Sequence, residues 1–253
     1  MGRKSLKKYE RIILIITGIV FVFALWWFLS FIINSTLFPG PLRTFEELGT
    51  LLAKQSTYLA VGGTLLRLGL AFLISFLAAF ILGTISGLFK PLKVFLSPLI
   101  IVLKTIPTAA LILIMICLLL PKQALLIVVF LVMFPILYES VVSGIENIDD
   151  SVLMALRIDA KPYGLKSIFK VIIPMSSPYI LLGIIQSIGL GMKVSIMAEV
   201  LVGNPRIPGL GIILHDGYQY AYMPQVFAVA LIAIVLIGLV DTGLSFAKKK
   251  LKH

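Results

Sequence analysis

Six long apolar runs constrain this chain more than any other feature, because each is long enough to cross a membrane. A helix of about 20 apolar residues spans the hydrocarbon core of a bilayer. The runs cover residues 12–33, 62–88, 96–120, 124–142, 178–202 and 226–247. Pro107 interrupts the third run and Pro135 the fourth, but neighbouring helices can satisfy the backbone groups that a proline frees. The pattern predicts an all-α, polytopic membrane protein of about six transmembrane helices.

The amino-acid composition agrees with this prediction. Of the 253 residues, 60% are hydrophobic and 13% are charged, and the mean hydropathy is +1.10. Soluble domains contain about 45–50% apolar and about 25% charged residues, so a soluble enzyme and a disordered chain are both excluded. A β-barrel would show short segments of alternating hydrophobicity instead of long runs.

The positive charges predict how the spans are oriented. The chain has 22 Lys and Arg residues and a net charge of +11. If the amino terminus is cytoplasmic, most of these residues lie on the cytoplasmic side, and both termini are expected there, because cytoplasmic segments carry the excess of Lys and Arg. Their position beside apolar runs favours an orientation signal, so no nucleic-acid partner is expected. The outer connections then hold only Arg43, Lys54, Lys122 and Arg206.

The spans and the charges divide the chain into three parts. A basic cytoplasmic N-terminus covers residues 1–11, a transmembrane domain covers 12–247, and a basic cytoplasmic C-terminus covers 248–253. The domain includes a cytoplasmic loop at 143–177 and an outer loop at 203–223. The first run is longer than a signal-peptide core and no small-residue cleavage site follows it, so it is expected to remain as the first span.

The cytoplasmic loop is predicted to contain two short helices. Asp149, Asp150 or Ser151 can cap the first helix, and a proline and a glycine at positions 162 and 164 end it. Pro174 is expected to end the second helix, and Pro178 to begin the next span. Each helix has an apolar stripe, formed in the first by Val152, Leu153 and Leu156 and in the second by Leu165, Ile168, Phe169 and Ile172. The stripes could rest on the protein's own helices or in the lipid headgroups, or could dock a cytoplasmic partner.

The segment 150–178 resembles the cytoplasmic loop of bacterial ATP-binding-cassette (ABC) importer permeases. Its close, Val171-Ile172-Ile173-Pro174, corresponds to the family's Ile-x-Leu-Pro ending. Ala155-Leu156-Arg157 stands where the family has Glu-Ala-Ala, and Lys161 stands where it has glycine, with Gly164 three residues later. Further motifs resemble the nitrate/taurine/aliphatic-sulfonate branch, in the same order along the chain: Leu103-Lys104-Thr105-Ile106-Pro107, Ala198-Glu199, Pro208-Gly209-Leu210-Gly211 and Pro224-Gln225-Val226-Phe227-Ala228.

This resemblance implies the permease subunit of an ATP-driven importer in the bacterial cytoplasmic (inner) membrane. A homodimer would form the pathway in the lipid bilayer, cytoplasmic ABC ATPase subunits would grip the loops, and an extracytoplasmic solute-binding protein would deliver the solute. The branch implies a small organic or inorganic anion such as a sulfonate, taurine or nitrate, with a thiamine-precursor-like solute as the alternative. The chain contains no Gly-x-x-x-x-Gly-Lys-Ser/Thr sequence, the phosphate-binding loop of many ATPases. It is therefore not expected to be an enzyme or to bind a cofactor directly; ATP and Mg would sit on the partner ATPase.

The same resemblance assigns the residues that couple the loop to the ATPase. ATP binding would draw the two ATPases together, and the loop helices would move with them as rigid levers. The residues assigned to this coupling are Leu153, Ala155, Leu156, Arg157, Asp159, Lys161, Gly164, Phe169 and Pro174.

The fifth span carries small residues at every fourth position. Gly183, Ser187, Gly191 and Ser195 lie on one helix face, and small residues allow membrane helices to approach closely. This face is expected either to line the contact between two copies or the pathway, or to pack within one subunit. Gly83 and Gly87, with Ala79, repeat the spacing in the second span.

Three cationic residues lie within spans, where a charge is costly unless it reaches water or a partner. Arg67 and Lys104 are expected to extend toward the membrane surface. Lys193 is expected to face the pathway and to help an anion across, because Glu199 is six residues away and does not face it on one helix. Glu139 and Asp241 are expected to pair with the basic margin.

Two other classes of protein remain as alternatives. A secondary transporter would need acids at mid-depth, whereas the acids here cluster at span ends. A membrane-embedded enzyme would need a catalytic constellation, and none is recognised in a chain with two histidines and one cysteine. Cys117 is expected to be a core residue, and His215 has no partners at metal-ligand spacing, so no metal site is predicted. The tyrosines of the outer loop are expected to belt the membrane surface, or to contact the binding protein.

Overall fold

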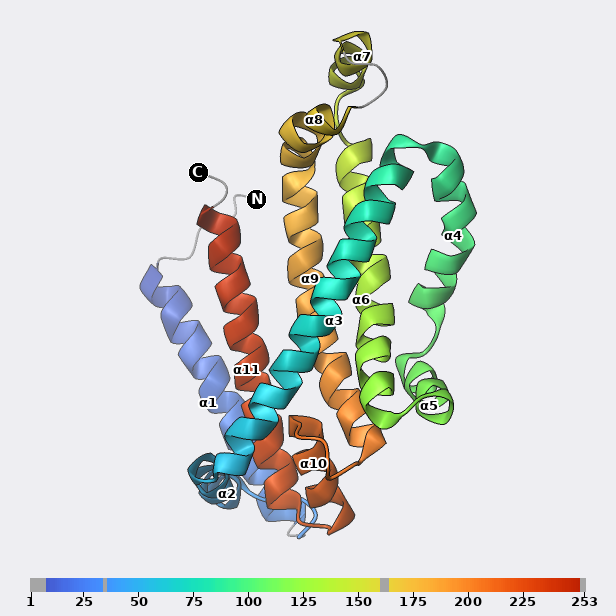
Figure 1. The fold of residues 1–253 in the computed structure, drawn as a ribbon. Helices are drawn as coiled ribbons and strands as arrows, with labels where there is room; N and C mark the ends of the chain where they lie inside the picture. Colours follow the sequence, from blue (N-terminus) through green and yellow to red (C-terminus); the bar gives the residue numbers. More distant parts are fainter. Residues whose placement is uncertain (1–7, 34–35, 160–163, 251–253) are drawn as a thin grey trace.

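The computed structural model describes residues 8–33, 36–159 and 164–250, and over these ranges the chain is helical with no strand (Figure 1). The helices are α1 (Lys8–Ile33), α2 (Pro41–Ala53), α3 (Gln55–Leu88), α4 (Lys90–Thr105), α5 (Thr108–Leu118), α6 (Pro121–Glu146), α7 (Asp150–Asp159), α8 (Leu165–Ser167), α9 (Ile173–Val202), α10 (Leu210–Gln219) and α11 (Met223–Lys250). A π-helical segment, Ile168–Ile172, joins α8 to α9.

The number of membrane spans agrees with the sequence. Five helices among the described residues are long and apolar enough to cross a membrane, and a sixth span is counted if α4 and α5 are taken together. These two helices are bent by 100° at Pro107, which has no N–H to donate and restricts the residue before it. Pro135, by contrast, lies inside α6 without breaking it.

The core of the molecule is the contact of α3, α6 and α9. Figure 1 shows α3 running obliquely across α6 and α9. Met133 and Leu137 of α6 and Met192 of α9 are buried at this contact. A Cβ atom added to Gly83 would lie 2.9 Å from the Cβ of Val141, so the absence of a side chain lets α3 lie directly against α6.

The small-residue face of α9 is buried in the same way. Gly183 lies against Ser140 of α6, and Gly191 lies against Met133 and against Leu68 of α3. Ser187 and Ser195 are also buried. These four residues are thus buried within the subunit, as the second of the two expectations for this face has it.

The helices place the loops at two opposite ends. The start of α1, the end of α11, α7 and α8 lie at one end of the molecule, whereas α2 and α10 lie at the other (Figure 1). This arrangement is that of six passes through the membrane when α4 and α5 form one pass. It agrees with the expectation that both termini face the same side.

The cytoplasmic loop differs from its prediction at its second helix. Asp149 caps α7 as expected, since the backbone N–H and the hydroxyl of Ser151 both donate to its Oδ1, at 3.0 and 2.9 Å. Pro174, however, does not end the second helix, which continues from Leu165 into α9. The π turn at Ile168–Ile172 shifts the hydrogen-bond register just before Pro174, where an α-helical carbonyl would meet the proline ring.

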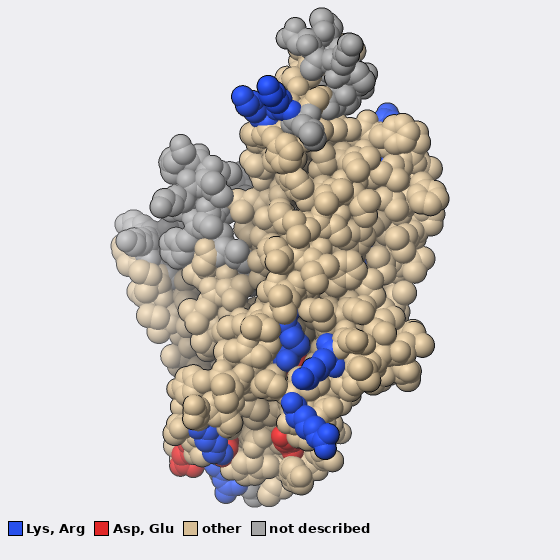
Figure 2. Space-filling view, in the orientation of Figure 1, with Lys and Arg blue, Asp and Glu red and all other residues tan. Residues whose placement is uncertain are grey.

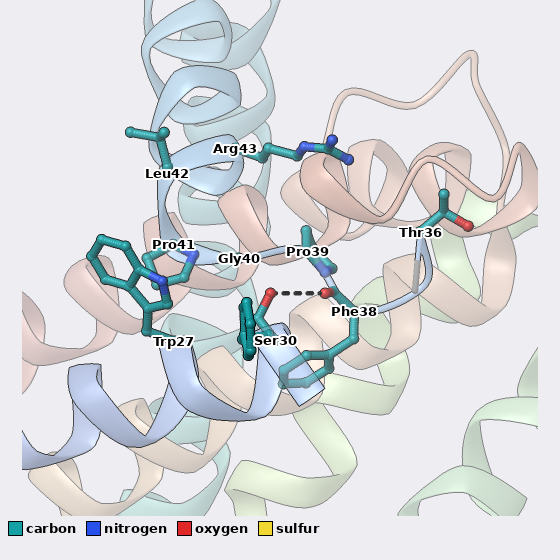
Figure 3. Close-up of a pocket in the computed structure, with 10 residues that line it drawn as sticks. Trp27, Ser30, Thr36, Phe38, Pro39, Gly40, Pro41, Leu42 and Arg43 are labelled. Carbon is teal, nitrogen blue, oxygen red and sulfur yellow. Dashed lines mark hydrogen bonds between the residues drawn. The ribbon is translucent and has the colours of Figure 1, made fainter. Parts of the chain in front are cut away.

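Helix α1 lies at the edge of the bundle. Its apolar stretch is not buried against the rest of the chain, apart from aromatic contacts such as Trp26 with Phe227. A cavity of about 480 Å³ separates its end from the start of α2 (Figure 3). The chain is held across this gap by Ser30 Oγ, which donates to the carbonyl of Phe38 at 3.4 Å, and by Trp26 Nε1, which donates to that of Pro39.

Candidate functional site

The first candidate region is the helix α7, which projects from one end of the bundle (Figure 1). One side of it rests on the protein's own helices, because Val152 and Leu156 pack against a cluster that includes Ile145 and Ile172. The other side is exposed: Met154 is 64% accessible. The expectation that the apolar stripe rests on the protein's own helices is thus met by Val152 and Leu156, and the other side of α7 is open.

The residues assigned to coupling divide between these two sides. Leu156 is half-buried, whereas Ala155, Gly164, Phe169 and Pro174 are exposed. Phe169 is 60% accessible and lies in the π segment beside α8. Lys161 lies outside the described residues, and so do the side chains of Leu153, Arg157 and Asp159.

The second candidate region is a buried ionic network at the opposite end. Glu199 of α9 is fully buried, and its Oε1 accepts a hydrogen bond from Arg67 Nη2 of α3 at 2.5 Å. Its Oε2 accepts from Thr64 Oγ1 at 3.0 Å and from the backbone N–H of Gly211 at 2.9 Å. A buried carboxylate requires such a set of donors and an opposite charge, because its desolvation is otherwise very costly.

The segment Pro208–Gly211 closes this network from the outer loop. Arg67 Nη2 also donates to the carbonyl of Pro208 at 2.8 Å, and the N–H of Leu210 donates to Thr64 Oγ1 at 3.0 Å. A Cβ atom on Gly209 would lie 2.6 Å from Glu199 Oε2 and 2.7 Å from Arg67 Nη2. Glycine is needed here because the backbone passes directly over the ion pair.

The prediction for Arg67 was therefore wrong. Its guanidinium does not extend to the membrane surface but turns inward to Glu199, and the side chain is only 13% accessible. The two sequence motifs Ala198-Glu199 and Pro208-Gly209-Leu210-Gly211 meet at this one place. The sequence indicated this pair only through a cation and an acid in different spans. Because 132 residues separate them, the sequence does not show that they meet.

Lys104 also has a partner that the sequence did not predict. Its Nζ lies 2.6 and 2.8 Å from the two carboxylate oxygens of Glu139, which joins α4 to α6 just before the break at Pro107. Glu139 thus pairs with this in-span lysine instead of the basic margin, and the two side chains are 44% and 45% accessible. Glu146, in contrast, pairs with a lysine of the basic margin, Lys93, at 2.6 Å. The side chain of Asp241 lies outside the described residues.

Lys193 differs from these two cations. It lies on the exposed side of α9, and among the described residues it has no hydrogen-bond or ion-pair partner. Figure 2 shows that most of this face is uncharged, with Lys and Arg atoms grouped in its lower half and further charged atoms toward its two ends. Unlike Arg67 and Lys104, Lys193 therefore carries an uncompensated charge within a membrane helix.

The outer loop is tied to the bundle by polar contacts. Tyr222 donates its hydroxyl to Glu47 Oε2 at 2.7 Å, which joins the start of α11 to α2; this hydrogen bond raises the pKa of Tyr222. His215 Nδ1 lies 2.9 Å from the carbonyl of Val200. Tyr218 and Tyr220 are exposed. No group of three or more potential metal ligands occurs in the described part of the chain.

The fold resembles a known transporter fold. The solved structure "Inward facing conformations of the MetNI methionine ABC transporter" contains a chain that matches with a TM-score of 0.61 and 18% identity, over 81% of this chain and 98% of that one. Together with the helix that projects between two spans, this likeness defines the fold class: the all-helical fold of a type I ABC importer permease.

Sequence comparison identifies the family. Residues 75–247 match the family described as "Binding-protein-dependent transport system inner membrane component", and the chain belongs to it. The bicarbonate transport system permease protein CmpB of Synechococcus elongatus is 28% identical, over 94% of this chain and 87% of its own length. The putative aliphatic sulfonates transport permease protein SsuC of Bacillus subtilis is 29% identical, over 87% and 79%. The protein is thus a multi-pass transport subunit, as its sequence predicted.

Proposed function

We propose that two copies of this chain form the pathway of an importer for small anions in the bacterial cytoplasmic membrane. The family match over residues 75–247 carries this proposal. Two relatives carry names that specify bicarbonate and aliphatic sulfonates, which are both anions. The substrate class is therefore a small organic or inorganic anion.

ATP hydrolysis belongs to a partner subunit in this proposal. The exposed side of α7, which includes Met154, and the exposed Phe169 form an apolar surface. A groove on a cytoplasmic ATPase can bind α7 through this surface, as grooves bind short amphipathic helices. ATP and Mg bind to that partner, and this chain binds no cofactor directly. The support for this assignment is the position of α7, which projects beyond the spans at the end of the molecule where the termini lie.

The opposite end receives the solute from an extracytoplasmic binding protein. Helix α10 and the exposed tyrosines Tyr218 and Tyr220 form this end. The network around Glu199 fixes α10 to α3 and α9, so that a protein bound here meets a rigid surface. The same network weakens the alternative of a secondary transporter, because its buried acid already has a permanent cationic partner in Arg67.

The test is ATP-dependent uptake in proteoliposomes that contain this chain with its co-expressed ATPase. The solute-binding protein is added outside with labelled bicarbonate, nitrate, taurine or a thiamine precursor. We expect one of the anions to accumulate only when ATP is inside with the ATPase. Uptake of the thiamine precursor alone would overturn the anion assignment, and accumulation by this chain without an ATPase would overturn the importer mechanism.

A further inference from the structure

Three cationic side chains lie within the apolar runs of the membrane helices, and the structure pairs two of them with acids. Arg67 of α3 is paired with Glu199, and Lys104 of α4 is paired with Glu139. Lys193 of α9 has no such partner among the described residues. It is therefore the in-span cation whose charge is available to something outside the described chain.

Lys193 lies well inside α9, away from both of its ends. It lies nine residues before the end of α9 at Val202, which is about 14 Å along the helix axis. It lies 20 residues after the start of α9 at Ile173, which is about 30 Å. A lysine side chain reaches about 6 Å along its four-carbon stem, so its ammonium cannot reach either end of the helix. A charge at this depth must face water or a partner instead of lipid.

The side of α9 that carries Lys193 is open along its length. Gln186, Leu190, Lys193 and Met197 are all exposed and follow one another at spacings of three or four residues, which places them on one side of the helix. The opposite side holds the small residues that pack on α6. The open side thus has a polar residue about two turns before Lys193 and a methionine one turn after it.

We propose that Lys193 is the residue that contacts the anion in the translocation pathway, and that the open side of α9 lines this pathway. This inference rests on the proposed function and names the residue that would give the pathway its preference for anions. The ammonium supplies a positive charge that no neighbouring acid among the described residues cancels. Arg67 does not serve this purpose, because the carboxylate of Glu199 cancels its charge.

The experiment compares how fast anionic and cationic thiol reagents modify a cysteine one turn from Lys193. The identity of the solute need not be known. Met197→Cys is made in the full chain with Cys117→Ser, and the complex with its partners is kept in membrane vesicles. The rate of thiol modification is compared for an anionic reagent, ethylsulfonate methanethiosulfonate, and a cationic one, trimethylammonium-ethyl methanethiosulfonate. The same ratio is then measured after Lys193→Gln and after Lys193→Arg.

We expect both reagents to react with the thiol of the Met197→Cys variant. The anionic-to-cationic rate ratio should fall roughly tenfold in Lys193→Gln, as expected for the loss of one nearby charge in a partly aqueous site. Lys193→Arg should keep the ratio. Ala198→Cys, at the buried neighbour of this position, is the matched control and should not react. An unchanged ratio in Lys193→Gln would overturn the proposal, and so would the absence of reaction in Met197→Cys.

A second measurement separates this inference from the proposed function. Wild-type, Lys193→Gln and Lys193→Arg complexes are compared in the uptake assay for the anion that the wild type imports, with ATPase activity recorded in parallel. We expect Lys193→Gln to lose at least tenfold in uptake while ATP hydrolysis continues, and Lys193→Arg to retain uptake. Normal uptake by Lys193→Gln would overturn the role of Lys193 alone, whereas a wild type that imports no anion would overturn the proposed function.

Discussion

At the scale of single residues, the carboxylate of Glu199 is the group with the most demanding environment. It is removed from water and is held by donors from two other parts of the chain: Thr64 and Arg67 of α3, and the backbone of Gly211 in α10. A buried ion pair contributes less to the free energy of unfolding than its Coulomb energy, because both charges lose their hydration. The loss of one partner is nevertheless costly, because it leaves the other charge buried and unpaired. This asymmetry gives a prediction.

We expect Glu199→Gln to lower the free energy of unfolding by about 3–5 kcal/mol, since it leaves the guanidinium of Arg67 without a counter-charge. Arg67→Met should be similarly destabilising. The double variant Arg67→Met with Glu199→Gln should recover part of the loss, because no buried charge remains. The measurement is the midpoint of thermal unfolding of the detergent-purified complex. Additive losses in the double variant would contradict a direct interaction between the two side chains.

A second prediction compares two adjacent glycines on α3. A Cβ atom on Gly63 would collide with the carbonyl of Pro208, whereas a Cβ on Gly62 would meet nothing within 4 Å. We expect Gly63→Ala to lower the free energy of unfolding by roughly 1–3 kcal/mol through overpacking, and Gly62→Ala to raise it by up to about 1 kcal/mol through helix propensity. Because the two changes are chemically identical, equal effects on thermal unfolding would show that Pro208 does not lie against α3.

The sequence could identify the members of this site but not their pairing. Glu199 and the segment Pro208–Gly211 stood out as motifs, and Arg67 stood out as a charge in a span. Their meeting depends on how α3 crosses α9, which follows from the close packing of Gly191 against Leu68. A pattern along one helix carries no information about this crossing, so Arg67 was expected at the surface.

At the scale of elements, the apolar runs predicted the helices well, because whether a segment lies in a membrane depends on its own residues. Prediction failed where the structure depends on other segments or on a local change of hydrogen-bond register. Pro174 was read as the end of a helix, but a proline in the first turn of α9 costs no hydrogen bond once the π segment has shifted the register. The bend between α4 and α5 was visible only as Pro107, while its angle depends on the helices around it.

The helix α7 gives a prediction at this scale. We expect Met154→Asp to abolish ATP-driven uptake while the chain still inserts into the membrane, because the side chain is exposed and the change affects only the surface offered to a partner. Met154→Leu, which keeps an apolar side chain, should retain uptake. Uptake and co-purification of the ATPase are measured for both variants. Wild-type co-purification of the ATPase with Met154→Asp would contradict docking at this surface.

At the scale of the whole molecule, the two sides of α9 have different roles. The buried side joins α9 to α6 and α3, and the other side is exposed in the single subunit. Small residues bring α9 close to α6 and α3, whereas the exposed positions carry larger side chains such as Leu190 and Met197. The sequence showed the small residues but did not show which neighbour they would meet.

This division predicts a crosslinking pattern between copies. In a Cys117→Ser background, we expect Leu190→Cys on the open side to link two copies through a bifunctional maleimide that reaches across the pathway. Ser187→Cys, on the buried side and less than one turn away, should not be linked. The products are separated by size under denaturing conditions. A dimer band from Ser187→Cys, or none from Leu190→Cys, would place the second copy elsewhere.

The two internal ion pairs have an electrical consequence. Moving one elementary charge through a membrane voltage of 100 mV involves about 2.3 kcal/mol, so a transporter whose helices carried bare charges would do work against the voltage in every cycle. Arg67 with Glu199 and Lys104 with Glu139 each form a neutral unit. Displacement of α3, α4, α6 and α9 therefore transfers no net charge from these two pairs, whereas the charge of Lys193, which has no partner among the described residues, moves through the voltage with its helix.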